Sequence, residues 1–345
     1  MARSRGWRDG IDAVDASLLD DYQSGFPVAE RPYRVVGDRL GVAEDDLFER
    51  VERLLREGLV RRVGPVLNPP VIGSSTLAAL RVPDGRFDAV ADAVNAHPQV
   101  NHNYRRDHAW NTWFVVTAGS RVRRDEVVAR IERETGLDAL VLPLRTEYYI
   151  DLEFPVVNDD RVARERETGV RGASPTPVRE DAMTDLSQIA TRLIRTVHDG
   201  FPGTATPYRH LANELGVHVD DVLATVENLL DRRAIKRIGL VVNHRATGFS
   251  NNSMVVWDVP AAEVDDRGVA AGRLPFVTYA CRRRRRPERG WQYNLFTMLH
   301  GRDRATVDAH VDHLASDVLP YDHARLTTTD VLKQTGARYE ALLDA

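Results

Sequence analysis

The chain has 345 residues, enough for about two domains of ~150 residues or for several smaller ones. With 43% hydrophobic and 28% charged residues, its composition is that of a globular protein, which excludes a disordered or collagen-like chain. No run of 18 apolar residues is present, and no apolar stretch follows the charged start, so we expect neither a membrane partner nor a secretory signal. The single cysteine, Cys281, excludes internal disulfides and multi-cysteine metal sites, and the balance predicts a cytoplasmic protein.

The charge balance argues against a protein whose main task is to hold DNA. The formal net charge is −4, whereas such proteins usually carry a basic domain. The basic residues comprise only two lysines, Lys236 and Lys333, against 45 arginines. This bias reflects either a GC-rich genome or arginines that bind carboxylates or phosphates through the guanidinium fork.

The chain contains an internal repeat. Gly25-Phe26-Pro27 returns as Gly200-Phe201-Pro202, at an offset of 175. At this offset, 20 of the 49 positions between 25 and 73 are identical, without a gap. The chain therefore contains two copies of one domain arrangement, and the fold has to be assigned to each copy.

The repeat continues beyond residue 73, with a longer second copy. The stretch Trp110–Trp113 aligns with Tyr293–Phe296 at an offset of 183, so the second copy has eight additional residues, in or near Arg282–Arg289. Between the copies, the segment Val156–Asp181 is charged and then rich in Pro, Gly and Ser, which is typical of a linker.

The first part of each copy has the pattern of a winged helix-turn-helix unit. Pro32 suits the first turn of a helix, and Asp45 can cap the next one. In the first copy we expect one helix around 18–22, a second over 32–40 and a third from Asp45 to Gly58. A small β wing over 59–67, which turns at Asn68, should follow them. Three helices followed by a wing define this motif.

The second part of each copy alternates strands and helices. In the first copy we expect a strand at 75–82, a helix at 86–96, strands at 99–106 and 110–117, a helix at 124–135 and a strand at 140–149. In the second copy we expect a strand at 252–259, a helix at 262–272, strands at 275–282 and 292–299, a helix at 303–316 and a strand at 321–329. The order β-α-β-β-α-β predicts a ferredoxin-like sandwich.

The predicted fold class is therefore α+β, a tandem duplication of a winged helix-turn-helix unit plus a ferredoxin-like (βαββαβ) domain. The expected domains are winged helix-turn-helix units at 11–70 and 183–245, ferredoxin-like domains at 71–155 and 246–335, and a linker at 156–182. Such domains often pair through their sheets, so we expect the two copies to form an intramolecular pseudo-dimer. Further assembly into a homo-oligomer is left open by the sequence.

The third helix of each winged unit would enter the major groove if the chain read DNA. In the first copy, the helix from Asp45 to Glu57 has five acidic and three basic residues, and in the second, Asp220–Asp231 has four acidic residues and no basic one. DNA affinity depends on neutralised phosphates, and base reading needs Arg, Lys, Asn or Gln on this face. Acidic helices argue against DNA as a partner, although basic residues after them, such as Arg61 and Arg232, leave contact with a backbone open.

The densest polar cluster of the first copy lies at residues 100–114, across a predicted hairpin. Alternate residues of a strand share a face, so His102, Tyr104 and Arg106 point one way and Arg105 the other. One face therefore offers an imidazole, a phenol and a guanidinium. A hydrogen-bonded hairpin histidine without a chemical role is an equally good interpretation of His102.

The second copy carries a run of arginines within Arg282–Arg289. This run is a solvated loop, a nucleic-acid patch or an anion clamp. Trp291, Tyr293 and Phe296 lie beside it in the sequence and favour a large planar anion over a plain phosphate.

Three further residues near these clusters have simpler interpretations. Cys281 is expected to be a small buried residue, since no His–Asn partner set is evident for a nucleophile. Trp113 is typical of a core residue unless it borders a cleft. His300 ends an apolar strand, at the edge of the core or in the lining of a site.

Two motifs carry a resemblance to a known family: HNYRRDHAWNTWF at His102–Phe114 and YNLFTMLHG at Tyr293–Gly301. With the doubled plan, they resemble siroheme decarboxylases, which are built on the scaffold of Lrp/AsnC-type regulators and normally consist of two related subunits. The resemblance covers both copies and implies that the two subunits are fused here. It further implies a carboxy-lyase that removes the C12 and C18 acetate carboxyls of siroheme, giving 12,18-didecarboxysiroheme in the alternative heme biosynthesis pathway, without oxygen or a redox cofactor.

The resemblance also assigns roles to residues. It implies His102 as proton donor or substrate contact, Tyr104 as its helper, and Arg105 and Arg106 as carboxylate clamps. Apart from the substrate's iron, for which His102 is a candidate axial ligand, no metal and no cofactor are expected. The expected substrate-binding residues are Arg105, Asn111, Trp113, Arg282, Arg283, Tyr293, Asn294 and His300.

The second copy departs from the family pattern. The second type of subunit often has His-Cys-Tyr before its arginine, whereas this chain has Tyr279-Ala280-Cys281 before Arg282. This favours one working cleft centred on the first copy, to which Arg282, Arg283 and His300 contribute. The alternative functions are an Lrp/AsnC-type DNA-binding transcriptional regulator and a tetrapyrrole sensor or heme carrier without turnover.

Overall fold

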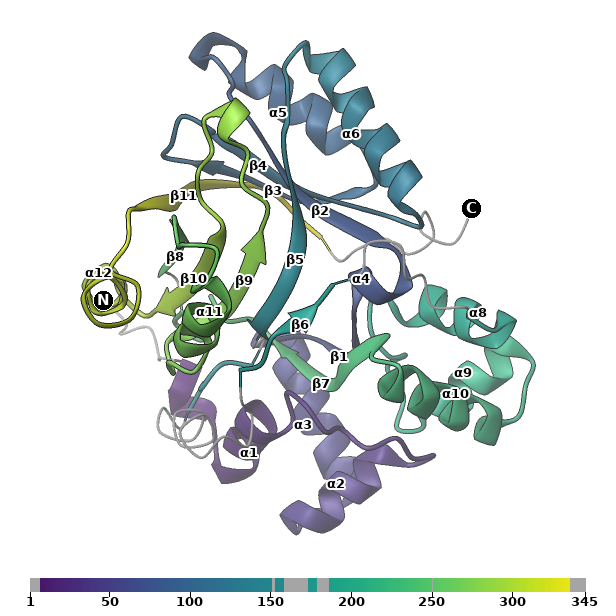
Figure 1. Ribbon diagram of the computed structural model, residues 1–345. Coiled ribbons are helices and arrows are strands. Elements are labelled where there is room, and N and C mark those ends of the chain that lie inside the picture. Colours follow the sequence, from purple (N-terminus) through teal and green to yellow (C-terminus); the bar gives the residue numbers. More distant parts are fainter. Residues whose placement is uncertain (1–6, 151–152, 158–172, 179–185, 250, 336–345) are drawn as a thin grey trace. The chain divides into compact units, whose positions relative to one another are not determined.

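The computed structural model describes residues 7–150, 153–157, 173–178, 186–249 and 251–335 (Figure 1). The chain divides into two compact units, and each unit combines matching parts of both copies. Unit 1 comprises Met1–Asn68, Glu153–Val162 and Asp185–Gly248, and unit 2 comprises Pro69–Leu152, Ala163–Thr184 and Phe249–Ala345. Within the described ranges, no helix is both long and apolar enough to cross a membrane.

Unit 1 contains the helices of the two winged units. Its described helices are the 3₁₀ helix Trp7–Gly10, α1 (Ala13–Asp21), α2 (Pro32–Leu40) and α3 (Glu44–Arg56), then α8 (Gln188–Val197), α9 (Pro207–Leu215) and α10 (Val219–Asp231). Proline begins α2 and α9, where its missing N–H has no helical partner to lose. Gly41 and Gly216 end these helices in the left-handed conformation, which glycine adopts without a steric penalty. The three-helix pattern is confirmed in both copies.

The wing differs from the prediction. Residues 60–67 form one strand, β1 (Val60–Leu67), which ends before Asn68 as expected but does not pair with a returning strand of its own copy. Its partner is β7 (Ile235–Val242) of the other copy, and the two strands pair antiparallel with Gly64 opposite Gly239. Each copy thus supplies half of a shared two-stranded sheet, a pairing between distant segments that the local sequence pattern does not specify.

The Gly-Phe-Pro motifs repeat because each one binds the other copy's strand. The Phe26 N–H donates to the Ile238 carbonyl oxygen (3.0 Å), and the Phe201 N–H donates to that of Val63 (2.7 Å). Backbones approach closely here, since a Cβ atom on Gly239 would lie 2.3 Å from the Gln23 carbonyl oxygen. Contact between the copies therefore leaves no room for a side chain at Gly239, and little at Gly64 and Gly200.

Unit 2 contains the two βαββαβ domains. Their described elements are β2 (Ser74–Leu80), α5 (Phe87–Ala96), β3 (Val100–Arg106), β4 (Thr112–Ala118), α6 (Arg121–Thr135) and β5 (Leu140–Ile150), then β8 (Asn251–Trp257), α11 (Val264–Gly272), β9 (Val277–Arg283), β10 (Leu295–Gly301), α12 (Arg304–His313) and β11 (His323–Gln334). Shorter elements are α4 (Pro69–Ile72), β6 (Thr176–Pro177), the 3₁₀ helices Asp84–Arg86 and Pro287–Arg289, and a π-helical turn at Leu314–Val318. The predicted element order is confirmed in both copies.

The last strand of each copy crosses into the sheet of the other. The first half of β5 pairs with β2 of its own copy, and the second half pairs with β9 of the other copy. β11 likewise pairs first with β8 and then with β3. The long strands therefore form a closed ring of pairings, in the order β2-β4-β3-β11-β8-β10-β9-β5 and back to β2.

Three apolar cores stabilise this arrangement. One lies under α5 and α6, which cover the β2–β4–β3 sheet (Figure 1), and a second lies under α11 and α12. The third contains strand and hairpin residues of both copies and no helix residue, so it lies on the opposite face of the strands. Trp113, Cys281, Trp291 and Phe296 are buried in this third core, as expected for Cys281. Trp113, which was expected among the substrate-binding residues, is 1% exposed.

The segment predicted as a linker is partly built into the units. In unit 1, the N–H groups of Val156 and Val157 donate to the Asp20 carboxylate. In unit 2, the short strand β6 pairs with β5. Residues 158–172 and 179–182 of the predicted linker lie outside the described residues.

The close approach at Gly239 gives a stability prediction. We expect Gly239→Ala to lower the free energy of unfolding by roughly 2 kcal/mol or more, because its methyl group has to displace backbone. Gly85→Ala is the matched control, since a Cβ atom there has nothing within 4 Å. Urea unfolding of both variants measures the difference, and equal stability would contradict the contact.

Candidate functional site

The polar residues of β3 divide between its two faces as predicted. His102 and Tyr104 lie on one face, with ring centroids 6.0 Å apart, and both side chains are half-buried. Arg106 follows on the same face, with its guanidinium 5.4 Å from the centre of the Tyr104 ring. Arg105 points to the helix side and lies 4.1 Å over the Phe87 ring of α5. The structure thus brings His102, Tyr104 and Arg106 together and separates Arg105 from them.

Arg106 is committed to the protein interior. Its side chain is 5% exposed, and Nη1 donates to the Leu326 carbonyl oxygen (2.5 Å) and to Thr328 Oγ1 (3.0 Å) on β11. Burial lowers the pKa of its guanidinium to about 10. The residue therefore ties β3 to the exchanged strand of the other copy.

Arg283 makes the corresponding contact in the opposite direction. Its Nη1 donates to the Leu142 carbonyl oxygen of β5 (2.6 Å), and its guanidinium lies 5.6 Å from the centre of the Phe296 ring. The two arginines hold the exchanged strands from both sides, each reaching from its own copy to the other.

Two predicted substrate-binding asparagines are hydrogen-bonded to the backbone. The Asn111 amide donates to the Val82 carbonyl oxygen and accepts from its N–H, at 2.8 and 2.9 Å. Asn294 makes the same pair of bonds with Val259, at 2.9 and 3.0 Å. Each amide holds the loop after the first strand of its own domain.

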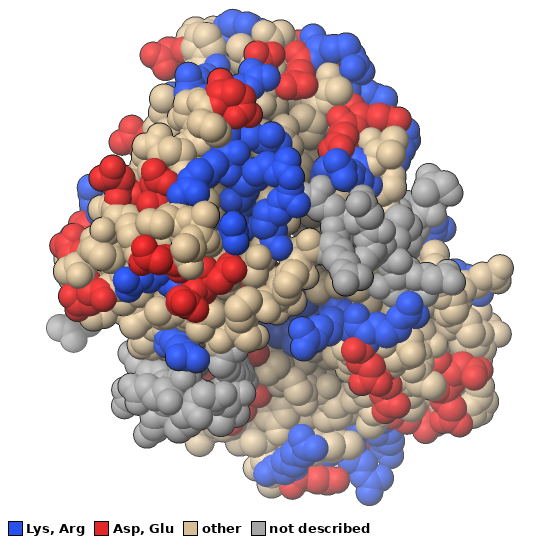
Figure 2. Space-filling view, in the orientation of Figure 1, with Lys and Arg blue, Asp and Glu red and all other residues tan. Residues whose placement is uncertain are grey.

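The arginine run of the second copy borders a hollow of about 520 Å³ in unit 2. Its lining residues are Arg145, Arg282, Arg283, Arg284, Arg285 and Asn294. Lys and Arg side chains gather on this face of unit 2, over the region of β5 and β9 (Figures 1 and 2). Five arginines around one hollow make it a candidate anion-binding site, and bidentate pairing suits guanidinium groups to carboxylates.

Sequence reasoning missed Arg145, Arg284 and Arg285 as lining residues. Arg284 and Arg285 belong to the arginine run of the second copy, in which the family resemblance implies only Arg282 and Arg283 as substrate-binding residues. Arg145 lies on β5 of the first copy and reaches this hollow through strand exchange. Its place could not be read from a local pattern.

The register shows what replaces His102 in the second copy. His102 pairs with Val115 on β4, and Tyr279 pairs with Met298, the residue of β10 that corresponds to Val115. A tyrosine therefore occupies the histidine position. Burial raises the pKa of the Tyr279 phenol well above its ordinary value and also raises that of the Cys281 thiol, so neither group ionises readily at neutral pH.

The other two predicted residues of the second copy lie apart from each other. Tyr293 is half-buried beside Trp291, with ring centroids 5.0 Å apart, and burial raises its pKa. His300 is at the far end of β10, where its Nδ1 lies 2.9 Å from Thr278 Oγ1.

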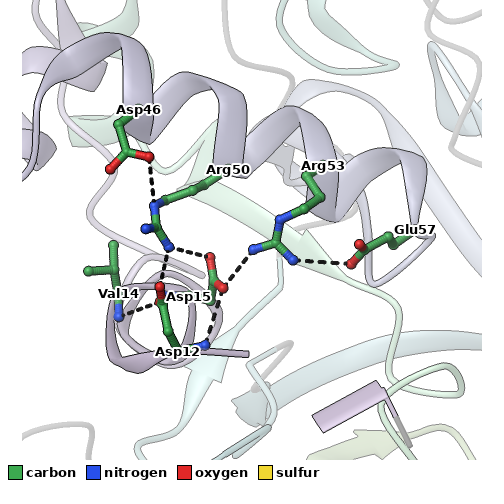
Figure 3. Close-up of polar contacts among 7 residues, drawn as sticks. All are labelled: Asp12, Val14, Asp15, Asp46, Arg50, Arg53 and Glu57. Atoms are coloured by element: carbon green, nitrogen blue, oxygen red, sulfur yellow. Dashed lines mark hydrogen bonds and ion pairs between the residues drawn. The ribbon is translucent and has the colours of Figure 1, made fainter. Parts of the chain in front are cut away.

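In unit 1, Arg50 and Arg53 of α3 are bound by acidic residues at the start of α1 (Figure 3). The Asp15 carboxylate is buried and accepts from Arg53 (2.6 Å) and Arg50 (3.3 Å). Arg50 also binds Asp12 and Asp46, and these bonds raise the pKa of its guanidinium. Arg50 and Arg53 thus serve the packing of α1 on α3.

This network weakens the case for a DNA-reading helix. The first turn of α3 is acidic, with Glu44, Asp45 and Asp46, and two of its arginines are already paired. In α10 the corresponding positions are Thr225 and Asn228. Neither helix offers the cationic surface that phosphate neutralisation requires.

Two family models match the chain, each once in each copy. The AsnC-like ligand binding domain matches residues 72–149 and 246–333, and the siroheme decarboxylase NirDL-like HTH domain matches 15–61 and 191–235. The class is therefore a tandem protein of Lrp/AsnC type, with a helix-turn-helix unit and a ligand-binding domain in each half.

Relatives that match over most of the chain identify the family within this class. The siroheme decarboxylase NirDL subunit of Paracoccus pantotrophus is 36% identical, over 95% of this chain and 97% of that protein. That of Paracoccus denitrificans is 37% identical, over 86% and 87%. The chain belongs to the siroheme decarboxylase family. A crystal structure of the siroheme decarboxylase NirDL with an iron-uroporphyrin III analogue covers 95% of this chain and 94% of its own, at a TM-score of 0.66 and 23% identity, which shows a shared fold.

The Asp15 network gives a second stability prediction. Asp15→Ala leaves Arg50 and Arg53 without their buried partner, so we expect a loss of about 3 kcal/mol in unfolding free energy. The second copy has Ala190, Thr225 and Asn228 at these positions, so the triple variant Asp15→Ala/Arg50→Thr/Arg53→Asn removes the unpaired charges. We expect it to be more stable than Asp15→Ala alone. Urea denaturation tests this, and a triple variant less stable than the single one would contradict the account.

Proposed function

We propose that this chain decarboxylates siroheme, removing the acetate carboxyls at C12 and C18 without an oxidant to give 12,18-didecarboxysiroheme. Family membership supports the reaction. The observation that carries it within this chain is the hollow lined by Arg145 and Arg282–Arg285. Siroheme is a flat macrocycle with eight carboxylates, and guanidinium groups pair with carboxylates in a fixed bidentate geometry.

The reaction itself needs one proton for each carboxyl lost. The bond between the carboxylate carbon and the methylene carbon breaks, CO₂ leaves, and the electron pair stays on the methylene carbon. A proton delivered there completes a methyl group. Imidazole is suited to this step because its ordinary pKa lies close to neutral pH.

We assign the proton donor to His102, with Tyr104 beside it on the same face of β3. Arg106 is bonded to the β11 backbone, so we assign it to positioning Tyr104 and the exchanged strand. A role for His102 as an axial ligand of the substrate's iron is the alternative use of the same imidazole.

We also propose that the two copies work as an intramolecular pseudo-dimer. The strand pairings between the copies support this proposal. β5 and β11 each pair partly with the sheet of the other copy, and β1 of the first copy pairs with β7 of the second. The cytoplasm as the place of this reaction remains a prediction, based on the lone cysteine and the composition.

Anaerobic incubation of the purified chain with siroheme tests the proposal. We expect a product lighter by two CO₂ units by mass spectrometry. We expect His102→Ala to lower the rate by about 100-fold or more, since a lost general acid costs about that factor, and Tyr104→Phe to have a smaller effect. His210→Ala is the control, because His210 is an exposed residue of α9. Siroheme bound without a mass change would indicate a tetrapyrrole-binding protein instead, and full activity of His102→Ala would remove the assigned donor.

A further inference from the structure

Unit 1 has a groove between α8 and α10, which we call the α8/α10 groove. Its volume is about 280 Å³, and its lining residues are Leu186, Ser187, Ile189, Ala190, Asp221, Ala224, Thr225, Asn228, Leu229 and Arg232. Half of these side chains are apolar. Asp221, Ala224, Asn228 and Arg232 are exposed, so the groove lies at the surface and α10 forms one of its walls.

The first copy has a hollow at the corresponding place, between α1 and α3, but its lining is charged. Its lining residues are Gly10, Asp12, Asp15, Asp46, Phe48, Glu49, Arg50, Glu52, Arg53 and Arg56. The second copy replaces Asp15, Arg50 and Arg53 by the uncharged residues Ala190, Thr225 and Asn228. Charged walls favour contact with water, whereas apolar walls favour burial against another protein surface.

The residues of α10 that border the groove form one stripe. The stripe comprises Asp221, Ala224, Thr225, Asn228 and Arg232. Their spacing of i, i+3, i+4, i+7 and i+11 places them on one face of the helix. An acidic residue begins the stripe, small residues occupy its middle, and a basic residue ends it. A second helix can therefore approach the middle closely, with charges available at both ends.

The stripe is complementary to itself in the antiparallel direction. We place two α10 helices side by side about a twofold axis at the midpoint of the stripe, between residues 226 and 227. Asp221 of each helix then lies opposite Arg232 of the other, and Thr225 lies opposite Asn228. Two ion pairs flank a centre of small side chains. The contact of one patch with the same patch of a second molecule is the usual form of a protein dimer.

The corresponding stripe of α3 lacks this property. Its ends are Asp46 and Glu57, so the same arrangement of two α3 helices would bring like charges together. Glu49 stands in the middle, where the second copy has Ala224. Self-complementarity therefore belongs to the second copy alone, although both helices descend from one repeat.

We propose that two molecules of this chain associate through α10, and that the α10 stripe of each covers the α8/α10 groove of the other. The contact uses one helix and its flank on each molecule, which is small for a permanent dimer, so we expect Kd in the micromolar range. The association gives the helix at the DNA-reading position of the winged unit a contact with protein instead of DNA. The inference does not depend on the proposed reaction.

Sedimentation velocity of the full chain, from about 1 to 100 µM, tests the association. We expect a concentration-dependent change from the mass of one chain to that of two. Asp221→Arg and Arg232→Asp each convert both ion pairs into like-charge pairs, so we expect each to raise Kd about tenfold or more. We expect a comparable loss for Ala224→Glu, which introduces the residue of the first copy at an exposed position. Glu227→Arg is the matched control on another face of α10, and its Kd should stay within about twofold of the parent.

A mixture of the two charge variants tests the twofold arrangement. When one molecule carries Asp221→Arg and the other Arg232→Asp, both ion pairs are restored, so we expect the equimolar mixture to dimerise like the parent. Restoration also shows that the Asp221 variant is folded, although it lacks the hydrogen bond from the His218 N–H (3.2 Å). A parent that stays monomeric at every concentration, charge variants that dimerise like the parent, or a mixture that stays monomeric would each overturn the inference.

Discussion

The exchange of the last strands is the constraint on which unit 2 depends. β5 and β11 each spend half their length in the other copy's sheet, and this closes the ring of strands. Arg106, which is buried, and Arg283, which is half-buried, secure the two crossings through hydrogen bonds to backbone carbonyl groups. A buried guanidinium costs solvation energy, and hydrogen bonds in a low-dielectric core offset that cost. The hollow exists because of this exchange, since it brings Arg145 to the arginines of the other copy.

Local patterns predicted most of the elements, because the signals that begin and end them are local. Pro32 and Gly41 bound α2, and apolar periodicity located the strands to within a few residues. The partners of those strands were not predictable, since pairing between copies depends on contacts far apart in the sequence. The wing shows this most clearly: β1 was expected to fold back at Asn68 and instead pairs with β7.

In the candidate site, too, features set by local periodicity were predictable and features set by tertiary contacts were not. The alternation of β3 correctly placed His102 and Tyr104 on one face and Arg105 on the other, because strand periodicity needs no tertiary information. Asn111 and Asn294 look like ligand-binding residues in the sequence and are held by backbone groups, which only coordinates reveal. The roles of all these residues in catalysis stay predictions.

The reciprocal pairing of β1 with β7 also has an evolutionary consequence. A subunit that must find a separate partner is constrained to remain compatible with it, whereas each half here is covalently supplied with its counterpart. Selection on assembly is thereby relaxed, and the halves are free to specialise. The Asp15 carboxylate, which Ala190 replaces in the second copy, is one difference of this kind between the halves.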